Sequence, residues 1–351
     1  MTGIAALLTV ALAPLSAASA LSPIDPMAEP FPPVAVDMSE VDCDRFASPK
    51  SVDRRRRGTA RRPLRSVPRL LRTLKAGQTG CLLPGRYHHD NPATLSRPGV
   101  KLVGLGGRAK VDGAIWITER ARRAQIRGLD LTATDSDFFI PLKVQANGAR
   151  IAGNRIRGSR STTCVLIGST HRTRNVRIER NWIHRCGRRG KLDHLIYVQD
   201  AVGTVIRGNV LSDNPGGWGV HLYPNADRSV VERNLIDGNQ GGVIFGGDGS
   251  RSSDGNVVRA NAITYSDPRW NVEGSWDDAV GVGNVAYGNC LYTIGRDAPA
   301  GIARRVGFAT GPSVSSDSSP YAVRRPRQYR FPDASPCGLL VEPLPSAFEQ
   351  R

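Results

Sequence analysis

Side chains that could transfer protons recur at matching positions of short apolar segments. Lys143, Tyr197, His221 and Tyr223 each lie within or directly after such a segment. Histidine and lysine are residue types that serve as general bases, and tyrosine can serve as a general acid. In a β-elimination, His221 or Lys143 would take the α-proton, and Tyr197 or Tyr223 would protonate the leaving oxygen. We therefore treat these four residues as the candidate catalytic group.

Aromatic, amide and cationic residues accompany this group and could bind a sugar acid. They share the same segments or the longer turn before Tyr197, and an arginine or lysine there would neutralise a carboxylate. The candidate substrate-binding residues are Trp116, Gln145, Arg185, Arg188, Lys191, His194 and Gln199.

Two acidic residues leave other chemistries open. Asp200 and Asp248 each follow an apolar segment, where they could hold Ca²⁺ or act as the acids of a glycoside hydrolase. Asp at such a place more often forms a turn. Hydrolysis usually needs two facing carboxylates, and the segments themselves contain none. The residue types therefore favour elimination over hydrolysis.

The spatial relation of these residues depends on an internal repeat. A phrase of the type Arg-Ile-Ala-Gly-Asn-Arg-Ile, found at 150–156, returns five more times in varied form up to 291. Its asparagines are spaced by 27, 28, 25, 27 and 28 residues. Such a regular period predicts a solenoid. The repeat asparagines are Asn154, Asn181, Asn209, Asn234, Asn261 and Asn289.

The repeat unit is predicted to be a coil of β-strands. Val and Ile alternate with polar residues, and Gly, Asn, Asp or Ser interrupts the pattern every few residues. Asn tolerates the left-handed backbone of a tight turn, and stacked Asn amides can hydrogen-bond to one another along the axis. An antiparallel sandwich with ordinary turn asparagines would not keep six of them in register.

A second strand in each coil is expected to carry the candidate site. Side chains alternate between the two faces of a strand, so the residue between two inward apolar residues points outward. Because coils stack about 4.8 Å apart, Tyr197 and His221 should touch, with Tyr223 beside them. The outward column is predicted to read Trp116, Lys143, Leu166, Tyr197, His221 and Ile244.

This pattern resembles the right-handed parallel β-helix proteins of the pectate-lyase-like superfamily. The resemblance covers about 41–300, including a lead-in at 77–87 that is similar to the first strand of that family. It implies an all-β fold, a right-handed parallel β-helix of about eight coils with an N-terminal capping helix. It does not imply one activity, because this fold carries lyases, hydrolases, epimerases and binding proteins.

The chain divides into four predicted segments. Residues 1–20 are expected to be a signal peptide, with an apolar stretch and a small-residue cleavage site. Residues 21–62 form a Pro- and Arg-rich segment, and 63–302 form the β-helix, whose eight coils begin at 98 and whose cap helix begins near Val67. Residues 303–351 lose the repeat and are expected to pack on the solenoid as an irregular tail.

Six cysteines suit an exported protein. We expect Cys43 to pair with Cys81 and Cys290 with Cys337, each bridge joining a terminal segment to the solenoid. Cys164 and Cys186 lie at different offsets from their repeat asparagines, which leaves their bridge open. Six cysteines allow 15 pairings, and the sequence does not choose among them.

The net charge of +17 favours a polyanionic partner. The first hypothesis is a secreted, monomeric lyase that acts on an acidic, uronate-containing polysaccharide. A non-catalytic β-helix that binds a polyanionic cell-surface polymer is the second, and a glycoside hydrolase using Asp200 and Asp248 is the third. No nucleic acid partner is expected, and no membrane span is expected once the signal peptide is removed.

Overall fold

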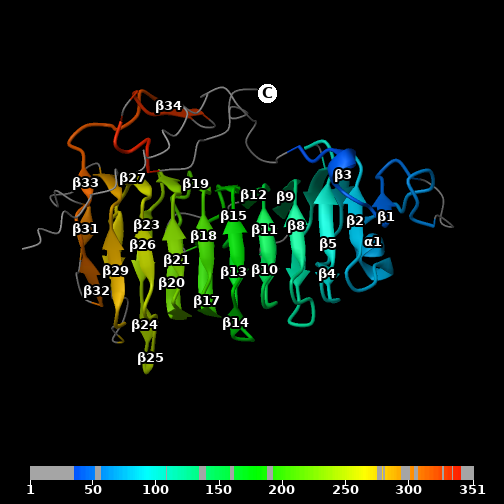
Figure 1. Cartoon of the computed structure of the whole chain (residues 1–351), viewed down its shortest axis with the longest axis horizontal. Helices are drawn as coiled ribbons and strands as arrows, with labels where there is room; N and C mark the ends of the chain where they lie inside the picture. The colour runs from blue at the N-terminus through cyan, green and yellow to red at the C-terminus, as the bar shows by residue number, and fades with distance from the viewer. Residues whose placement is uncertain are drawn as a thin grey trace, which may run out of the picture.

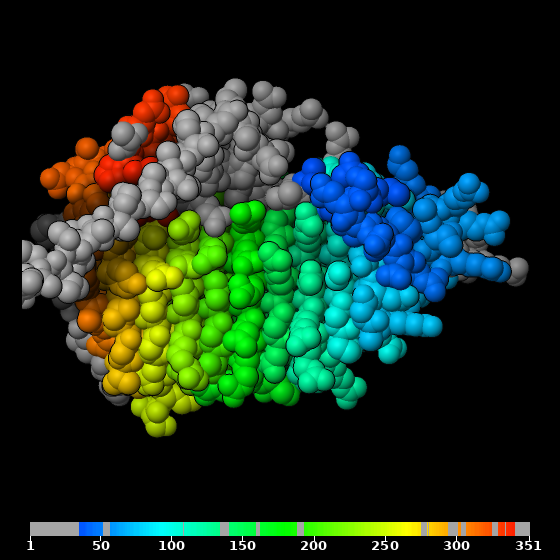
Figure 2. Space-filling model, viewed as in Figure 1, coloured from blue at the N-terminus to red at the C-terminus, as the bar shows by residue number. Residues whose placement is uncertain are grey.

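The chain forms a parallel β-helix in its computed structural model. The structure describes residues 35–51, 57–107, 109–133, 140–158, 162–187, 193–274, 279, 281–293, 301–303, 307–325, 328–333 and 335–340. Strands stack side by side along the longest axis of the molecule, in chain order from blue to orange (Figure 1). The same coils form successive bands of colour on the molecular surface (Figure 2).

Three parallel sheets run along the solenoid, and each coil contributes one strand to each sheet in turn. Sheet 1 consists of β1 (Arg45–Ala47), β2 (Thr79–Leu82), β5 (Lys101–Gly104), β8 (Gln125–Arg127), β11 (Arg150–Ala152), β15 (Arg177–Glu179), β18 (Val205–Arg207), β21 (Val230–Glu232), β26 (Val257–Arg259), β29 (Asn284–Tyr287) and β32 (Phe308–Thr310). Sheet 2 consists of β3 (Gly85–His88), β6 (Ala109–Asp112), β9 (Leu129–Ala133), β12 (Arg155–Gly158), β16 (Trp182–His184), β19 (Val210–Ser212), β22 (Leu235–Asp237), β27 (Ala262–Ser266), β30 (Cys290–Thr293) and β33 (Val314–Ser315). Sheet 3 consists of β4 (Ala93–Leu95), β7 (Ile115–Ile117), β10 (Leu142–Val144), β13 (Val165–Ile167), β14 (Thr173–Arg174), β17 (Ile196–Val202), β20 (Trp218–Asp227), β23 (Gly241–Phe245), β28 (Val272–Gly274) and β31 (Ile302–Ala303).

The predicted coils match these sheets. One strand of every sheet begins in each of the eight coils predicted between residues 98 and 302. The sheets also extend beyond the predicted solenoid: β1 lies within the segment 21–62, and β32 and β33 lie within the tail. These flanking strands lack the repeat asparagine, so the repeat alone does not reveal them.

The repeat asparagines form a buried ladder between sheets 1 and 2. All six side chains are at most 1% exposed. Each of the first five donates from Nδ2 to Oδ1 of the next, at 2.9–3.0 Å. The predicted stacking of Asn amides along the axis is therefore confirmed. Inward Ile and Val side chains beside the ladder fill the core, as at Ile178 and Ile206.

The left-handed residue of each tight turn is not the asparagine itself. The residue before it has positive φ, for example 62° at Gly153, 52° at Arg180 and 55° at Arg233. This corrects the expectation that Asn supplies the left-handed conformation. Its side chain must point inward to bond the next coil, so the preceding residue makes the turn.

Before the repeats, the chain forms one α-helix in its described part. Helix α1 (Val67–Thr73) begins where Ser66 accepts a hydrogen bond from the amide of Arg69, with Pro68 in the first turn. Val67, Leu70 and Leu71 are buried, and the helix contacts β1, β2 and β4. Its role as a cap over the first coil stays a prediction.

Two short hairpins and a 3₁₀ turn lie outside the three sheets. These are β24 (Gly247–Asp248) with β25 (Arg251–Ser252), β34 (Val323–Arg325) with β35 (Gln328–Arg330), and η1 (Met38–Glu40). Helices formed by the described residues are too short and polar to cross a bilayer. The predicted signal peptide lies outside those residues.

All six cysteines form disulfides. The predicted pairs Cys43–Cys81 and Cys290–Cys337 are confirmed. Cys164 and Cys186 also pair, with Cα atoms 5.3 Å apart, which settles the bridge that the sequence left open. Their different offsets are accommodated because Cys186 lies past the end of β16, where the chain turns toward sheet 3.

The C-terminal segment is held against sheet 2. The Tyr321 hydroxyl lies 2.6 Å from that of Thr264, while Asp237 accepts hydrogen bonds from Arg324 and Tyr329 at 3.0 Å. This segment returns over the end of the solenoid (Figure 1). Cys337 therefore closes a segment that side-chain contacts already position.

Removing the C-terminal bridge should loosen this segment. We expect Cys290→Ala/Cys337→Ala to cost about 2–4 kcal/mol, since the bridge closes a loop of 47 residues. Trypsin should then cleave after Arg330 several-fold faster than in the unaltered protein. Cys43→Ala/Cys81→Ala, at the other end, should leave this cleavage rate unchanged. Equal rates in both variants would show that the bridge does not hold the segment.

Candidate functional site

The outward column of sheet 3 has the predicted register. Lys143 pairs with Trp116 and Leu166, and Tyr197 pairs with Leu166 and His221. His221 then pairs with Ile244, and Ile244 with Glu273. The period-two alternation within strands places all of these on the outer face. Sequence reasoning therefore located the column and stopped one coil short of its end.

Three aromatic rings from this face lie against one another. The Tyr197 and His221 rings are stacked, with centroids 5.0 Å apart and an interplanar angle of 11°. Tyr223 lies on the same strand as His221, and its ring centroid is 5.1 Å from that of His221. We call Tyr197, His221 and Tyr223 the ring cluster. The predicted contact of these residues is thus present.

His194 contacts the ring cluster through His221. Its Nε2 lies 2.6 Å from Nδ1 of His221, and its Nδ1 lies 3.3 Å from the amide nitrogen of Trp218. The Trp218 amide can only donate, so Nδ1 of His194 accepts and carries no proton. A neutral His194 then holds its proton on Nε2 and donates it to His221. His221 must therefore carry its own proton on Nε2.

Burial keeps both imidazoles neutral. It lowers the pKa of His194 to about 3, and burial together with the nearby His194 lowers the pKa of His221 well below its usual value. Nε2 of His221 has no hydrogen-bond partner among the described residues. His221 thus presents an N–H donor. A base role at Nε2 would require the other tautomer, which conflicts with the Trp218 amide.

Tyr197 is held as a neutral phenol. Burial raises its pKa above the usual value, and the neighbouring Tyr223 and Asp248 raise it further. Tyr197 and Tyr223 are both half-buried, so one side of each remains open to solvent. Their rings and hydroxyl groups are the parts of the cluster that a ligand can reach.

Three residues behind the cluster were not found from the sequence. Trp218 lies 5.4 Å from His221 between ring centroids, and its Nε1 donates to buried Glu273. Arg269 bonds the other oxygen of Glu273 at 2.6 Å and lies over the Trp218 ring. Extending the inward apolar alternation to Val272 would have placed Glu273 in the column. Arg269 and Trp218 precede their apolar pairs and carry no comparable signal.

The predicted metal-binding carboxylates are occupied by protein partners. Asp248 accepts two hydrogen bonds from Arg251, at 2.8 and 2.6 Å, and Asp200 accepts one from Asn225 at 2.9 Å. Arg172 binds Asp227 beside them. Within the described part of the chain, no three His, Cys, Asp or Glu side chains group as a metal site requires. The Ca²⁺ hypothesis stays a prediction without support from this geometry.

The remaining predicted residues are not drawn together at the ring cluster. Lys143 lies over the Trp116 ring, 5.6 Å from its centroid and two coils before Tyr197. Gln145 bonds Thr170 at 2.7 Å. The pairing of β17 with β20 shifts between Val198 and Asp200, so Gln199 has no regular partner on the next coil.

The structure describes one of the three cations predicted in the turn before Tyr197. Arg185 follows β16 in sheet 2, where its charge acts on Asp213 rather than on the ring cluster. Arg188 and Lys191 lie outside the described residues. Arg185 therefore does not lie at the ring cluster, and the roles of Arg188 and Lys191 stay predictions. The arginine whose charge acts on Tyr197 is Arg251.

One family model matches residues 52–267, more than half of the chain and a range that includes the ring cluster. Its description reads "Protein of unknown function (DUF1565)". The chain belongs to this family. A search of curated proteins finds no match to this member of the family.

Solved structures share the fold at low identity. A GH136 lacto-N-biosidase from Eubacterium ramulus is 10% identical with a TM-score of 0.52, over 77% of this chain and 67% of that one. PfbA, a surface adhesin of Streptococcus pneumoniae, is 10% identical with a TM-score of 0.50, over 72% and 70%. Geobacillus virus E2 ORF18 is 12% identical with a TM-score of 0.48, over 76% of this chain and 61% of that one. This DUF1565 chain thus spans less than two thirds of the viral protein. The predicted parallel β-helix fold is confirmed.

Proposed function

We propose that this chain is an extracytoplasmic protein that binds a polysaccharide along the outer face of sheet 3. The stack formed by Tyr197, His221 and Tyr223 is the observation that carries the proposal. Aromatic rings offer flat apolar surfaces that suit the faces of sugar rings, and phenol hydroxyls supply hydrogen bonds at their edges. Two adjacent coils present such rings about 5 Å apart, so neighbouring parts of a sugar chain can be contacted together.

Charge at this face favours a neutral sugar segment over a run of uronates. The cations and carboxylates around the cluster are equal in number. Each of the three arginines already has a carboxylate partner, whereas Lys143 lies over the Trp116 ring. These groups are Lys143, Arg172, Arg251 and Arg269 on one side and Asp200, Asp227, Asp248 and Glu273 on the other. The positive charge that predicted an acidic partner is therefore not concentrated at this cluster. Three disulfides support an oxidising, extracytoplasmic location.

A lyase acting at the same place is the second candidate. The ring contact between Tyr197 and His221 favours it, because elimination needs an acid and a base within reach of one sugar. In the tautomer set by Trp218, His221 donates, so the Tyr197 hydroxyl would have to take the α-proton. Its raised pKa makes the phenolate scarce at neutral pH, which is why we place binding first.

Binding should depend on the ring cluster. Titration of a panel of neutral and acidic polysaccharides by calorimetry should yield at least one ligand. Its affinity should fall at least tenfold in Tyr197→Ala and in Tyr223→Ala, because each change removes a ring face. Tyr287→Ala is the matched control, since Tyr287 is an exposed tyrosine on sheet 1. Equal loss in Tyr287→Ala, or no ligand in the panel, would contradict the proposal.

Absorbance separates binding from elimination. A lyase product is unsaturated and absorbs in the near ultraviolet, whereas a bound polymer is unchanged. We expect no rise in absorbance, and Tyr197→Phe should keep most of the affinity because the ring remains. A rise that Tyr197→Phe abolishes would establish the lyase in place of the binding protein.

A further inference from the structure

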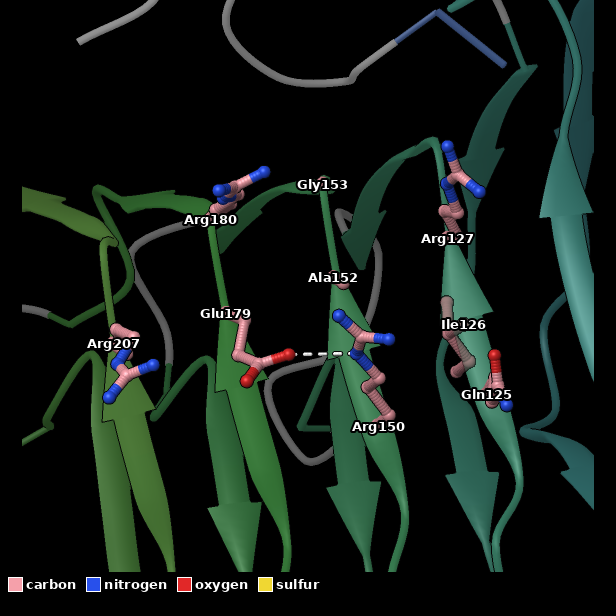
Figure 3. Close-up of a pocket in the computed structure, with 9 residues that line it drawn as sticks. All are labelled: Gln125, Ile126, Arg127, Arg150, Ala152, Gly153, Glu179, Arg180 and Arg207. Carbon is pink, nitrogen blue, oxygen red and sulfur yellow. Dashed lines mark hydrogen bonds and ion pairs between the residues drawn. The ribbon is translucent and has the colours of Figure 1, made fainter. Parts of the chain in front are cut away.

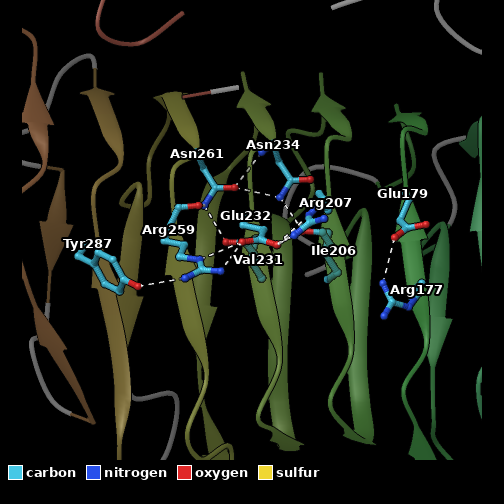
Figure 4. Close-up of polar contacts among 10 residues, drawn as sticks. All are labelled: Arg177, Glu179, Ile206, Arg207, Val231, Glu232, Asn234, Arg259, Asn261 and Tyr287. Atoms are coloured by element: carbon cyan, nitrogen blue, oxygen red, sulfur yellow. Dashed lines mark hydrogen bonds and ion pairs between the residues drawn. The ribbon is translucent and has the colours of Figure 1, made fainter. Parts of the chain in front are cut away.

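Arginines outnumber glutamates on the outer face of sheet 1. Outward arginines occur on β8, β11, β15, β18 and β26. The glutamates at outward positions from β8 to β26 are Glu179 and Glu232. Figure 4 shows this row seen from outside, with Arg177 and Glu179 at one end and Tyr287 at the other. Each glutamate serves two arginines, so every such group of three keeps one net positive charge.

Glu232 shows how firmly these groups are held. It accepts hydrogen bonds from Nε of Arg207 at 2.8 Å and from Nε of Arg259 at 2.9 Å (Figure 4). Burial alone would raise the pKa of Glu232, but the two arginines outweigh it and lower the pKa. Glu179 likewise lies 2.7 Å from Arg150 and 3.4 Å from Arg177. Both glutamates thus fix the arginine side chains of this face in place.

A hollow opens in this row where β11 presents Ala152 as an outward residue in place of a large side chain. Ala152 and Gly153 form its floor, between Arg127 on one neighbouring coil and Glu179 on the other. It encloses about 450 Å³. Figure 3 shows the side chains of Arg127, Arg150 and Arg180 around it. We call this hollow the arginine notch.

Charge and size in the arginine notch suit a small anionic group. Four of its lining residues are arginines (Arg127, Arg150, Arg180 and Arg207), and three glutamates (Glu40, Glu179 and Glu232) bind arginines of this lining. Glu179 and Glu232 are each shared with one more arginine, Arg177 and Arg259, so six arginines stand against three glutamates around the notch. Guanidinium groups bind carboxylates and phosphates through paired hydrogen bonds. The enclosed volume falls in the range of small-molecule sites, large enough for one sugar unit.

The geometry points to the arginine notch as a binding site for an oxyanion, the carboxylate or phosphate group of a sugar-sized ligand. Arg127 and Arg150 approach from sheet strands, and Arg180 approaches from the turn after β15. Glu179 holds Arg150 at the edge, and Glu40 lies 3.6 Å from Arg127. This site lies on sheet 1, so it stands or falls independently of the ring cluster on sheet 3.

The turn position of Arg180 allows a test that spares the fold. The equivalent residue before the repeat asparagine is glycine in the coils on either side, Gly153 and Gly208, and all three have positive φ. Arg180→Gly therefore removes a cation while relaxing the backbone. Arg233 occupies the same turn position two coils further on, outside the notch, with φ of 55°. Arg233→Gly is its matched control, with the same change in charge and backbone.

Glucuronate and glucose 6-phosphate are the probes, with glucose as the uncharged comparison, in calorimetric or NMR titrations of the full chain. Both anions should bind and glucose should not, and the tighter anion identifies the oxyanion preferred. Arg180→Gly should weaken binding at least fivefold, and Arg233→Gly less than twofold. Ala152→Gln, which fills the floor, should also weaken it at least fivefold. Raising the salt concentration should weaken binding in the unaltered chain by screening.

Three results would overturn this assignment: no binding of either anion at tens of millimolar, equal binding of glucose, or equal weakening by Arg180→Gly and Arg233→Gly. Circular dichroism and thermal unfolding of the three variants check that each is folded. Tyr197→Ala should leave anion binding unchanged. The polysaccharide titration and the anion titration can thus fail separately.

Discussion

Asn234→Ala should lower the free energy of unfolding by about 4 kcal/mol, a large loss for a single substitution. Asn234 accepts from the amide and Nδ2 of Asn209 at 2.9 and 3.0 Å. It also donates to the carbonyl of Ile206 at 2.9 Å and to Oδ1 of Asn261 at 2.9 Å. Alanine leaves the Asn209 amide and one Nδ2 hydrogen of Asn209 buried without an acceptor, and each such group costs about 1–3 kcal/mol.

Asn147→Ala is the control for this substitution. Asn147 accepts from the amide of Arg174 at 2.9 Å but is exposed, so water can replace it. We expect a loss below about 1 kcal/mol there. Urea unfolding followed by circular dichroism gives both values. Similar losses at Asn234 and Asn147 would show that the ladder does not hold the coils together.

Acid should destabilise the chain before its carboxylates are protonated. The folded-state pKa of His194 is lowered to about 3 by burial, below the value of about 6.5 in an unfolded chain. The unfolded state therefore binds a proton that the folded state refuses. The stability due to neutral His194 is complete above pH 6.5 and is lost as the pH falls toward 3. From pH 6.5 to 4.5 the loss should reach about 2 kcal/mol for His194 alone.

The pH window separates histidine from carboxylate effects. The lowered pKa of Glu232 also costs stability in acid, but only as the pH falls below about 4.5. His194→Gln keeps a donor and an acceptor without titrating, so the slope between pH 6.5 and 4.5 should shrink. His171→Gln, at an exposed histidine, should leave the slope unchanged. Stability that is flat between pH 6.5 and 4.5 in the unaltered chain would rule out a buried neutral pair.

The sequence was sufficient to predict the coils and the ring cluster. A fixed repeat sets which residues stack, and period-two alternation sets which of them point outward. Tyr197 and His221 could therefore be placed in contact from residue numbers alone. The same reasoning predicted the asparagine ladder, whose members differ in position by almost one constant period.

What the sequence could not give lies where the repeat does not apply. His194 lies in the turn before β17, and Trp218 is the first residue of β20, so their approach to His221 has no periodic signal. Arg251 meets Asp248 through a hairpin that one coil adds. The charge balance of each face also depends on which cations have carboxylate partners. The arginines beside the ring cluster have such partners, whereas arginines outnumber glutamates on the outer face of sheet 1.

Hydroxyl-radical footprinting with the polysaccharide that binds most tightly tests whether the polymer lies along the outer face of sheet 3. We expect oxidation of Tyr197 and Tyr223 to fall when the polymer is bound, while oxidation of Tyr287 on sheet 1 stays the same. Unchanged oxidation of Tyr197 and Tyr223, with protection elsewhere on the chain, would contradict binding along the outer face of sheet 3.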